Sequence, residues 1–147
     1  MIGEGDAVPA ATLTLSDGST LDLAGAGATV LYFYPKDDTS GCTKEAQDFT
    51  ELAAAFAKAG ARVVGVSRDG MNKHDKFIAK YDLKVALASD ADGALSEAFG
   101  TWVEKSMYGR KYMGMERATF VVRDGKVTRA WRKVKVPGHA AEVLEAV

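Results

Sequence analysis

The sequence predicts an α/β fold in which a mixed central sheet is flanked by helices and a hairpin opens the chain. Residues 28–34 form a continuous apolar and aromatic run typical of a buried central strand, and residues 62–67 are expected to form a second buried strand. A long segment with helical periodicity lies between them, and a second such segment follows. Strands that alternate with helices in this way indicate neighbouring parallel strands covered by helices on their faces.

The opening hairpin and the first helix are predicted from local patterns. Residues 12–15 and 19–23 alternate apolar and polar side chains, and a Ser-Asp-Gly turn joins them. Residues 42–59 carry apolar side chains at helical spacing, and Gly60 follows as a stop signal. We therefore expect one long amphipathic helix over residues 42–59.

The remaining elements complete the alternation. They are expected in this order: a helix over residues 73–81, a weak strand over 86–89, a short helix over 94–99, a hairpin over 118–133 and a closing helix over 138–147. Residues 101–116 are expected to form a loop whose large side chains cover the core or, for some of them, line an apolar entrance: Trp102, Met107, Tyr108, Tyr112 and Met113. A thioredoxin-like architecture satisfies this order of elements.

Length and charge limit the classes of protein to consider. With 147 residues, 47% of them hydrophobic, the chain fits one domain over residues 1–147. Its formal net charge of -1 gives no electrostatic argument for a nucleic-acid or membrane partner. The first nine residues lack the basic start and apolar run of a signal peptide, so we expect a cytoplasmic location.

The cysteine and histidine content argues against disulfide and metal chemistry within the chain. One cysteine, Cys42, excludes an intramolecular disulfide, so redox chemistry must use a second thiol from outside. His74 and His139 lie in separate predicted helices without a ligand pattern, and surface or packing positions suffice for both. We expect no metal and no cofactor.

Cys42 follows residues 35–41, which join a buried strand to a long helix. Loops at the carboxyl ends of such strands are where sites are built, and the free N–H groups of a first helical turn favour a negative sulfur. An exposed helix terminus supplies only ~0.3–1 kcal/mol, so a neighbouring cation is also expected. The residues alone leave two alternatives open, a reactive thiolate or a buried, inert thiol.

Pro35, Thr39 and Cys42, at their spacing, resemble the active-site motif of the peroxiredoxins. The wider string from Tyr32 to Ala46 is similar to the bacterioferritin-comigratory, or Q-type, branch (BCP/PrxQ). Further similarity, through residues 104–114 and 133–139, extends the resemblance over nearly the whole chain.

The resemblance implies roles for individual residues. Arg117, just before a predicted strand, corresponds to the family's catalytic arginine and would be the missing cation. The Thr39 hydroxyl would hold the peroxide oxygens while also capping the helix, and Pro35 would shield the sulfur from water. Glu45 could orient Arg117, although a carboxylate that favours the helix dipole is the plainer interpretation.

Gln47 stands where many members of this branch have a second cysteine. The resemblance therefore implies a one-cysteine peroxidase that reduces hydrogen peroxide and organic hydroperoxides through a Cys42 sulfenic acid. An external thiol, from thioredoxin, glutaredoxin or a small molecule, would recycle it, and the chain would be a monomer or weak homodimer. The alternative is a thioredoxin-fold redox sensor with slow turnover, and thiol-disulfide exchange is disfavoured because position 39 is threonine rather than cysteine.

Overall fold

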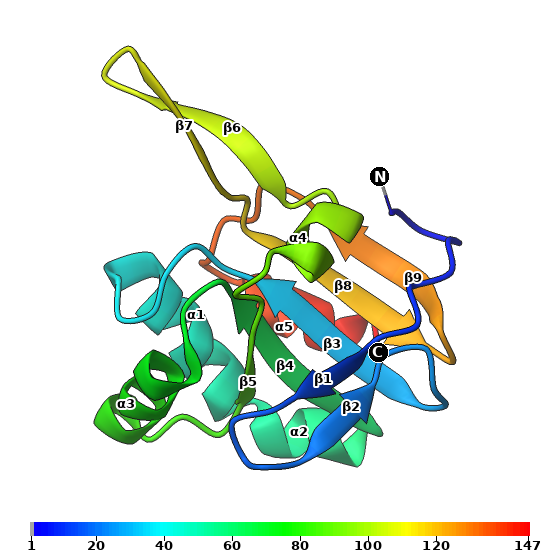
Figure 1. The fold of residues 1–147 in the computed structure, drawn as a ribbon. Helices are drawn as coiled ribbons and strands as arrows, with labels where there is room; N and C mark the ends of the chain where they lie inside the picture. Colours follow the sequence, from blue (N-terminus) through cyan, green and yellow to red (C-terminus); the bar gives the residue numbers. More distant parts are fainter. Residues whose placement is uncertain (1) are drawn as a thin grey trace.

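The structure, a computed structural model, describes residues 2–147 and is built on a five-stranded sheet. In spatial order its strands are β5 (Ala86–Ser89), β4 (Ala61–Ser67), β3 (Ala28–Phe33), β8 (Ala118–Arg123) and β9 (Lys126–Trp131) (Figure 1). β3, β4 and β5 are parallel, whereas β8 runs antiparallel to β3 and β9 antiparallel to β8. The predicted mixed sheet is confirmed.

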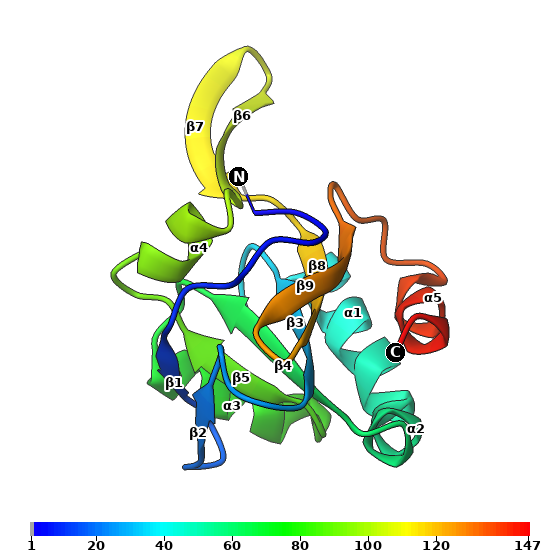
Figure 2. The same cartoon turned by 90° about the vertical axis from the view of Figure 1, so that its right-hand side faces the viewer.

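Helices and a hairpin cover the two faces of this sheet. The helices are α1 (Ser40–Glu51), α2 (Ala53–Lys58), α3 (Met71–Tyr81), α4 (Ala94–Ala98) and α5 (His139–Glu145). α1, α2, α3 and α5 bury side chains against one face, and α4 packs on the other. The predicted N-terminal hairpin, β1 (Thr12–Thr14) with β2 (Thr20–Asp22), lies on the α4 side (Figure 2).

The central strand β3 is buried from end to end because both of its faces are covered. Val30 and Tyr32 belong to the core under α1, α2, α3 and α5, whereas Leu31 and Phe33 belong to the core on the α4 side. Successive side chains of a strand point to opposite faces, so a strand covered twice must be apolar throughout. This explains the continuous apolar run in the sequence.

The helix expected over residues 42–59 is two helices, so this prediction was wrong in its extent. α1 begins at Ser40 and ends at Glu51, and Leu52 adopts φ -99° and ψ 4° before α2 begins. The Leu52 amide donates to the Phe49 carbonyl, a tighter bond than the i to i-4 bond of an α-helix. The apolar spacing continues across this break, so periodicity alone could not detect it.

The loop expected over residues 101–116 is a second hairpin, and this prediction was wrong. β6 (Trp102–Met107) pairs with β7 (Arg110–Met115) and projects from the body of the molecule (Figures 1 and 2). Its turn is formed by Tyr108 and Gly109, which both have positive φ. The large side chains near its tip are exposed instead of covering the core: Met107, Tyr108, Tyr112 and Met113.

Trp102, at the base of the hairpin, is half-buried and packs against the α4-side core, as expected. No helix among residues 2–147 has the length and apolar character needed to span a bilayer.

Candidate active site

Cys42 lies in the first turn of α1, where the sequence analysis placed it. The chain leaves β3 at Phe33 and enters α1 at Ser40, so Cys42 is the third residue of the helix. The first intrahelical bond runs from the Thr43 amide to the Thr39 carbonyl, 2.8 Å. The Cys42 amide therefore has no acceptor within its own helix, and the positive end of the helix lies at the sulfur.

The Arg117 guanidinium bridges Cys42 and Glu45. Its Nη2 lies 3.4 Å from the Cys42 Sγ and its Nη1 donates to Glu45 Oε1 at 2.7 Å. Arg117 immediately precedes β8, whose Ala118 pairs with Phe33 at the end of β3. Strand pairing thus brings a cation next to a sulfur that lies 75 residues away in the sequence.

Gly41 contributes room for this arrangement. A Cβ at this position would lie 3.2 Å from Arg117 Nη2, tighter than ordinary van der Waals contact. The absence of a side chain at Gly41 therefore lets the guanidinium lie over the first turn of α1.

Glu45 is buried beneath the guanidinium, with its side chain 2% exposed. Burial raises the pKa of this carboxyl from 4.5 to about 7, and the attraction of Arg117 only partly opposes the rise. Its second oxygen, Oε2, is buried without a hydrogen-bond partner among residues 2–147. A carboxyl in this position is easier to keep neutral than an ordinary glutamate.

Arg117 itself stays charged. Burial acts to lower its pKa, but the neighbouring Glu45 and Cys42 outweigh burial and raise it above the ordinary value. The site therefore contains a permanent cation in contact with the sulfur, which is the electrostatic feature expected from the sequence.

Cys42 is more covered than an open nucleophile would be, with 2% of the residue exposed. Large reaction partners cannot reach this sulfur while the first turn of α1 keeps its present position.

The Thr39 hydroxyl does not cap α1, so the expected capping role is wrong. Thr39 is the N-cap residue with extended backbone, φ -94° and ψ 157°, but its hydroxyl donates to the Lys36 carbonyl at 2.8 Å. Thr39 is an exposed residue, and because its hydroxyl proton is engaged with Lys36, the oxygen can still accept a hydrogen bond. Pro35 is also exposed, and its role as a shield for the sulfur stays a prediction.

Two aspartates anchor the loop between β3 and α1, and sequence reasoning missed both. The buried Asp37 carboxylate accepts from the Tyr34 hydroxyl at 2.5 Å and lies 2.6 Å from His74 Nδ1. Asp38, with a φ of 59°, binds Lys80 and Tyr81 of α3. The signal available in the sequence was two adjacent aspartates in the loop that precedes Cys42.

His74 and His139 are both buried, so they are packing rather than surface residues. His139 Nε2 lies 2.8 Å from the Thr119 hydroxyl. No group of three or more metal-ligating side chains gathers anywhere in residues 2–147.

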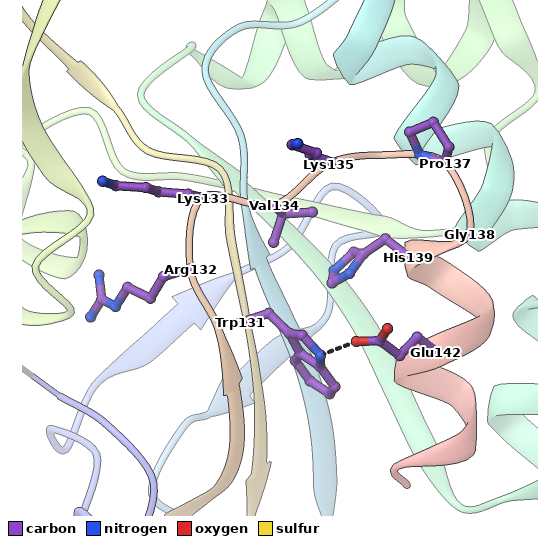
Figure 3. Close-up of a pocket in the computed structure, with 9 residues that line it drawn as sticks. All are labelled: Trp131, Arg132, Lys133, Val134, Lys135, Pro137, Gly138, His139 and Glu142. Carbon is purple, nitrogen blue, oxygen red and sulfur yellow. Dashed lines mark hydrogen bonds between the residues drawn. The ribbon is translucent and has the colours of Figure 1, made fainter.

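A surface hollow of about 420 Å³ opens beside the start of α5 but does not include Cys42. In Figure 3 the Trp131 indole points at Glu142 and donates to its carboxylate, while Arg132 and Lys133 extend away from His139. The Val134 amide donates to the Arg117 carbonyl at 2.9 Å. This segment supports the backbone at Arg117.

Comparison with known proteins places the site in a wider context. The model of the AhpC/TSA family matches residues 4–130. Peroxiredoxin Bcp of Xanthomonas campestris pv. campestris is 51% identical over 147 residues, covering 95% of this chain and 92% of that protein.

Solved structures are equally similar. Xanthomonas campestris peroxiredoxin Q has a TM-score of 0.87 at 48% identity, covering 95% of this chain and 92% of that one. The bacterioferritin comigratory protein of the same organism, studied for its alkyl peroxide reduction activity, has a TM-score of 0.87 at 47% identity, with 96% of each chain covered. The predicted thioredoxin-like fold is thereby confirmed.

Proposed function

The chain belongs to the AhpC/TSA family, in its Bcp/PrxQ branch of thiol-dependent peroxidases, and on this basis we propose that it reduces hydroperoxides with Cys42 as its single redox cysteine. One observation supports this most strongly: the Arg117 guanidinium lies 3.4 Å from the Cys42 sulfur at the N-terminus of a helix. A cation and free amides around a thiol favour the thiolate, which is the nucleophilic form.

In the proposed reaction, the Cys42 thiolate attacks one oxygen of the peroxide. A sulfur–oxygen bond forms, the oxygen–oxygen bond breaks, and its electron pair leaves on the second oxygen as a hydroxide or alkoxide. That leaving oxygen takes a proton and departs as water or an alcohol, and Cys42 becomes a sulfenic acid.

Arg117 stabilises this step because negative charge moves from the sulfur onto the leaving oxygen. A guanidinium next to both atoms stabilises the charge in either place without having to reorient. The hydrogen bond to Glu45 fixes the plane of the guanidinium, and Nη2 is left to face the sulfur.

The Thr39 hydroxyl orients the peroxide. Since its proton is directed to the Lys36 carbonyl, it accepts a hydrogen bond from the hydroxyl of the hydroperoxide. This contact and the guanidinium together align the oxygen–oxygen bond with the sulfur. Pro35 would limit the access of water, as the family resemblance implies.

Recycling of the sulfenic acid requires a thiol from outside the chain. Gln47 occupies the position on α1 where the family resemblance implies a second cysteine in many members, and Cys42 is the one cysteine of the sequence. An external thiol attacks the sulfenic sulfur, releases water and leaves a mixed disulfide, which a second thiol then reduces. Thioredoxin, glutaredoxin and small thiols are the proposed reductants.

The burial of Cys42 adds a condition to this second step. A sulfur in a residue that is 2% exposed is accessible to a small peroxide through slight motions, but not to the thiol of a folded protein. The first turn of α1 must therefore loosen after oxidation. Hydrogen peroxide and organic hydroperoxides are both proposed as substrates, and the relative studied for alkyl peroxide reduction supports the second class.

The test is peroxide consumption by the purified protein with an external thiol present, alongside Cys42→Ser. The wild-type protein should consume peroxide and, after excess peroxide without thiol, gain the mass of added oxygen on Cys42. Equal consumption by Cys42→Ser, or an unmodified Cys42 after excess peroxide, would contradict the proposal.

A further inference from the structure

The peptide bond between Lys36 and Asp37 is held at both of its polar ends. Its carbonyl accepts from the Thr39 hydroxyl at 2.8 Å, and its N–H, on Asp37, donates to Asp69 Oδ2 at 2.8 Å. A peptide unit is planar, so its N–H and C=O directions cannot change independently. Whatever fixes the N–H therefore also fixes the carbonyl that orients Thr39.

Asp69 is suited to fix this peptide because it is itself immobilised. The Ser67 hydroxyl donates to the same Oδ2 at 2.8 Å, and Lys73 Nζ lies 3.2 Å from Oδ1. Burial acts to raise the pKa of Asp69, but its bonds with the Asp37 amide, Ser67 and Lys73 outweigh burial and lower it. Asp69 is thus a fixed carboxylate at the end of β4, outside the reacting atoms.

The side chain of Asp37 provides a second anchor for the same peptide. Its Oδ2 lies 2.6 Å from His74 Nδ1, and His74 Nε2 lies 3.0 Å from the Ala88 carbonyl. Since a carbonyl can only accept, Nε2 donates to Ala88, and the short contact between Nδ1 and Oδ2 is a second hydrogen bond of the same ring. The Asp37 side chain is therefore tied to α3, and its amide is tied to Asp69.

We propose that Asp69 is a positioning residue for peroxide reduction. Through the Lys36–Asp37 peptide, Asp69 keeps the Thr39 hydroxyl donating to the Lys36 carbonyl, so that the lone pairs of this hydroxyl face the peroxide. This inference rests on the proposed function. Among the hydrogen bonds of residues 2–147, Asp69 has none to Cys42 or Arg117. It acts on the substrate through one peptide unit and the Thr39 hydroxyl.

The experiment compares Asp69→Ala, Asp69→Asn, Thr39→Val and the double variant Asp69→Ala/Thr39→Val by stopped-flow reaction with hydrogen peroxide. Loss of the Thr39 acceptor should lower the second-order rate constant about 100-fold, by analogy with the loss of one preorganised transition-state hydrogen bond. Asp69→Ala should lower it about tenfold, because the peptide is then free to turn away from its productive orientation.

Two comparisons separate positioning from general structural support. Asp69→Asn retains an oxygen that can accept from the Asp37 amide, so its rate should recover to within about threefold of wild type. The double variant should be no slower than Thr39→Val alone, because Asp69 has nothing left to position. Alkylation of Cys42 by iodoacetamide does not use Thr39, so it should proceed at the wild-type rate in all four variants.

Asp75→Ala is the matched control, since Asp75 is an exposed carboxylate on α3, and it should react with peroxide as the wild type does. Multiplicative losses in the double variant, no rescue by Asp69→Asn, or slower alkylation in Asp69→Ala would overturn the inference while leaving the proposed function intact. A wild-type protein that does not consume peroxide would overturn both.

Discussion

Glu45→Gln should change how stability depends on pH. The substitution keeps an oxygen that can accept from Arg117 Nη1 but removes the group whose pKa burial raises from 4.5 to about 7. The pKa of the wild-type carboxyl is therefore higher in the folded state than in the unfolded state. Its stabilising contribution is therefore fully present below pH 4.5 and is lost as the pH rises through about 7.

The magnitude follows from this difference. A pKa that rises from 4.5 to about 7 on folding corresponds, at ~1.4 kcal/mol per pH unit, to about 3 kcal/mol. Between pH 4 and 8 the unfolding free energy of the wild type should fall by this amount relative to that of Glu45→Gln. Urea denaturation of both proteins at several pH values from 4 to 8 measures it, because other titrating groups cancel in the difference. Unfolding free energies that stay parallel over this range would refute the reasoning.

Substitutions at three further positions test the site and its surroundings. Arg117→Met should slow the reaction with peroxide at least ~100-fold. Arg117→Lys should recover only part of the loss, because one ammonium cannot bond both Cys42 and Glu45 as the guanidinium does. Wild-type rates for either variant in stopped-flow would count against the role of the guanidinium. Gly65→Ala places a Cβ 2.7 Å from the Tyr32 ring and should cost about 1–3 kcal/mol in urea denaturation, whereas unchanged stability would show that the ring can move aside. Gln47→Cys should form a disulfide with Cys42 after peroxide treatment, and this disulfide should block further oxidation. Because the Cα atoms of the two positions are more than ~7 Å apart in an intact helix, helicity should be lost when the disulfide forms. A sulfinic acid on Cys42 by mass spectrometry would contradict this.

The sheet and most helices could be predicted because their residues carry signals that follow from burial. β3 is buried throughout, and β4 is buried except at Arg62, because helices cover one face of the sheet and α4 with the N-terminal hairpin covers the other. The β6–β7 hairpin escaped prediction because it projects into solvent, so neither of its strands needs an apolar face. Its signal was the Tyr108–Gly109 turn, which the aromatic content of the segment concealed.

Cys42 and Arg117 were predicted as a pair from the family resemblance, and the register of β3 with β8 brings them together. The support around Thr39 could not be predicted in the same way. It depends on Asp69, at the end of a different strand, meeting one amide of the loop before α1. Such a contact has no local periodicity, and the same aspartate would be read from sequence as an ordinary turn residue.

The proposed function requires that Arg117 and the helix terminus activate the Cys42 sulfur toward peroxide. The most direct test is the second-order rate constant of Cys42 oxidation by hydrogen peroxide at pH 7, measured beside free cysteine and Arg117→Met. The wild-type rate should exceed that of free cysteine by orders of magnitude, and most of the excess should be lost in Arg117→Met. A wild-type rate equal to that of free cysteine would contradict it and favour a slowly oxidised sensor.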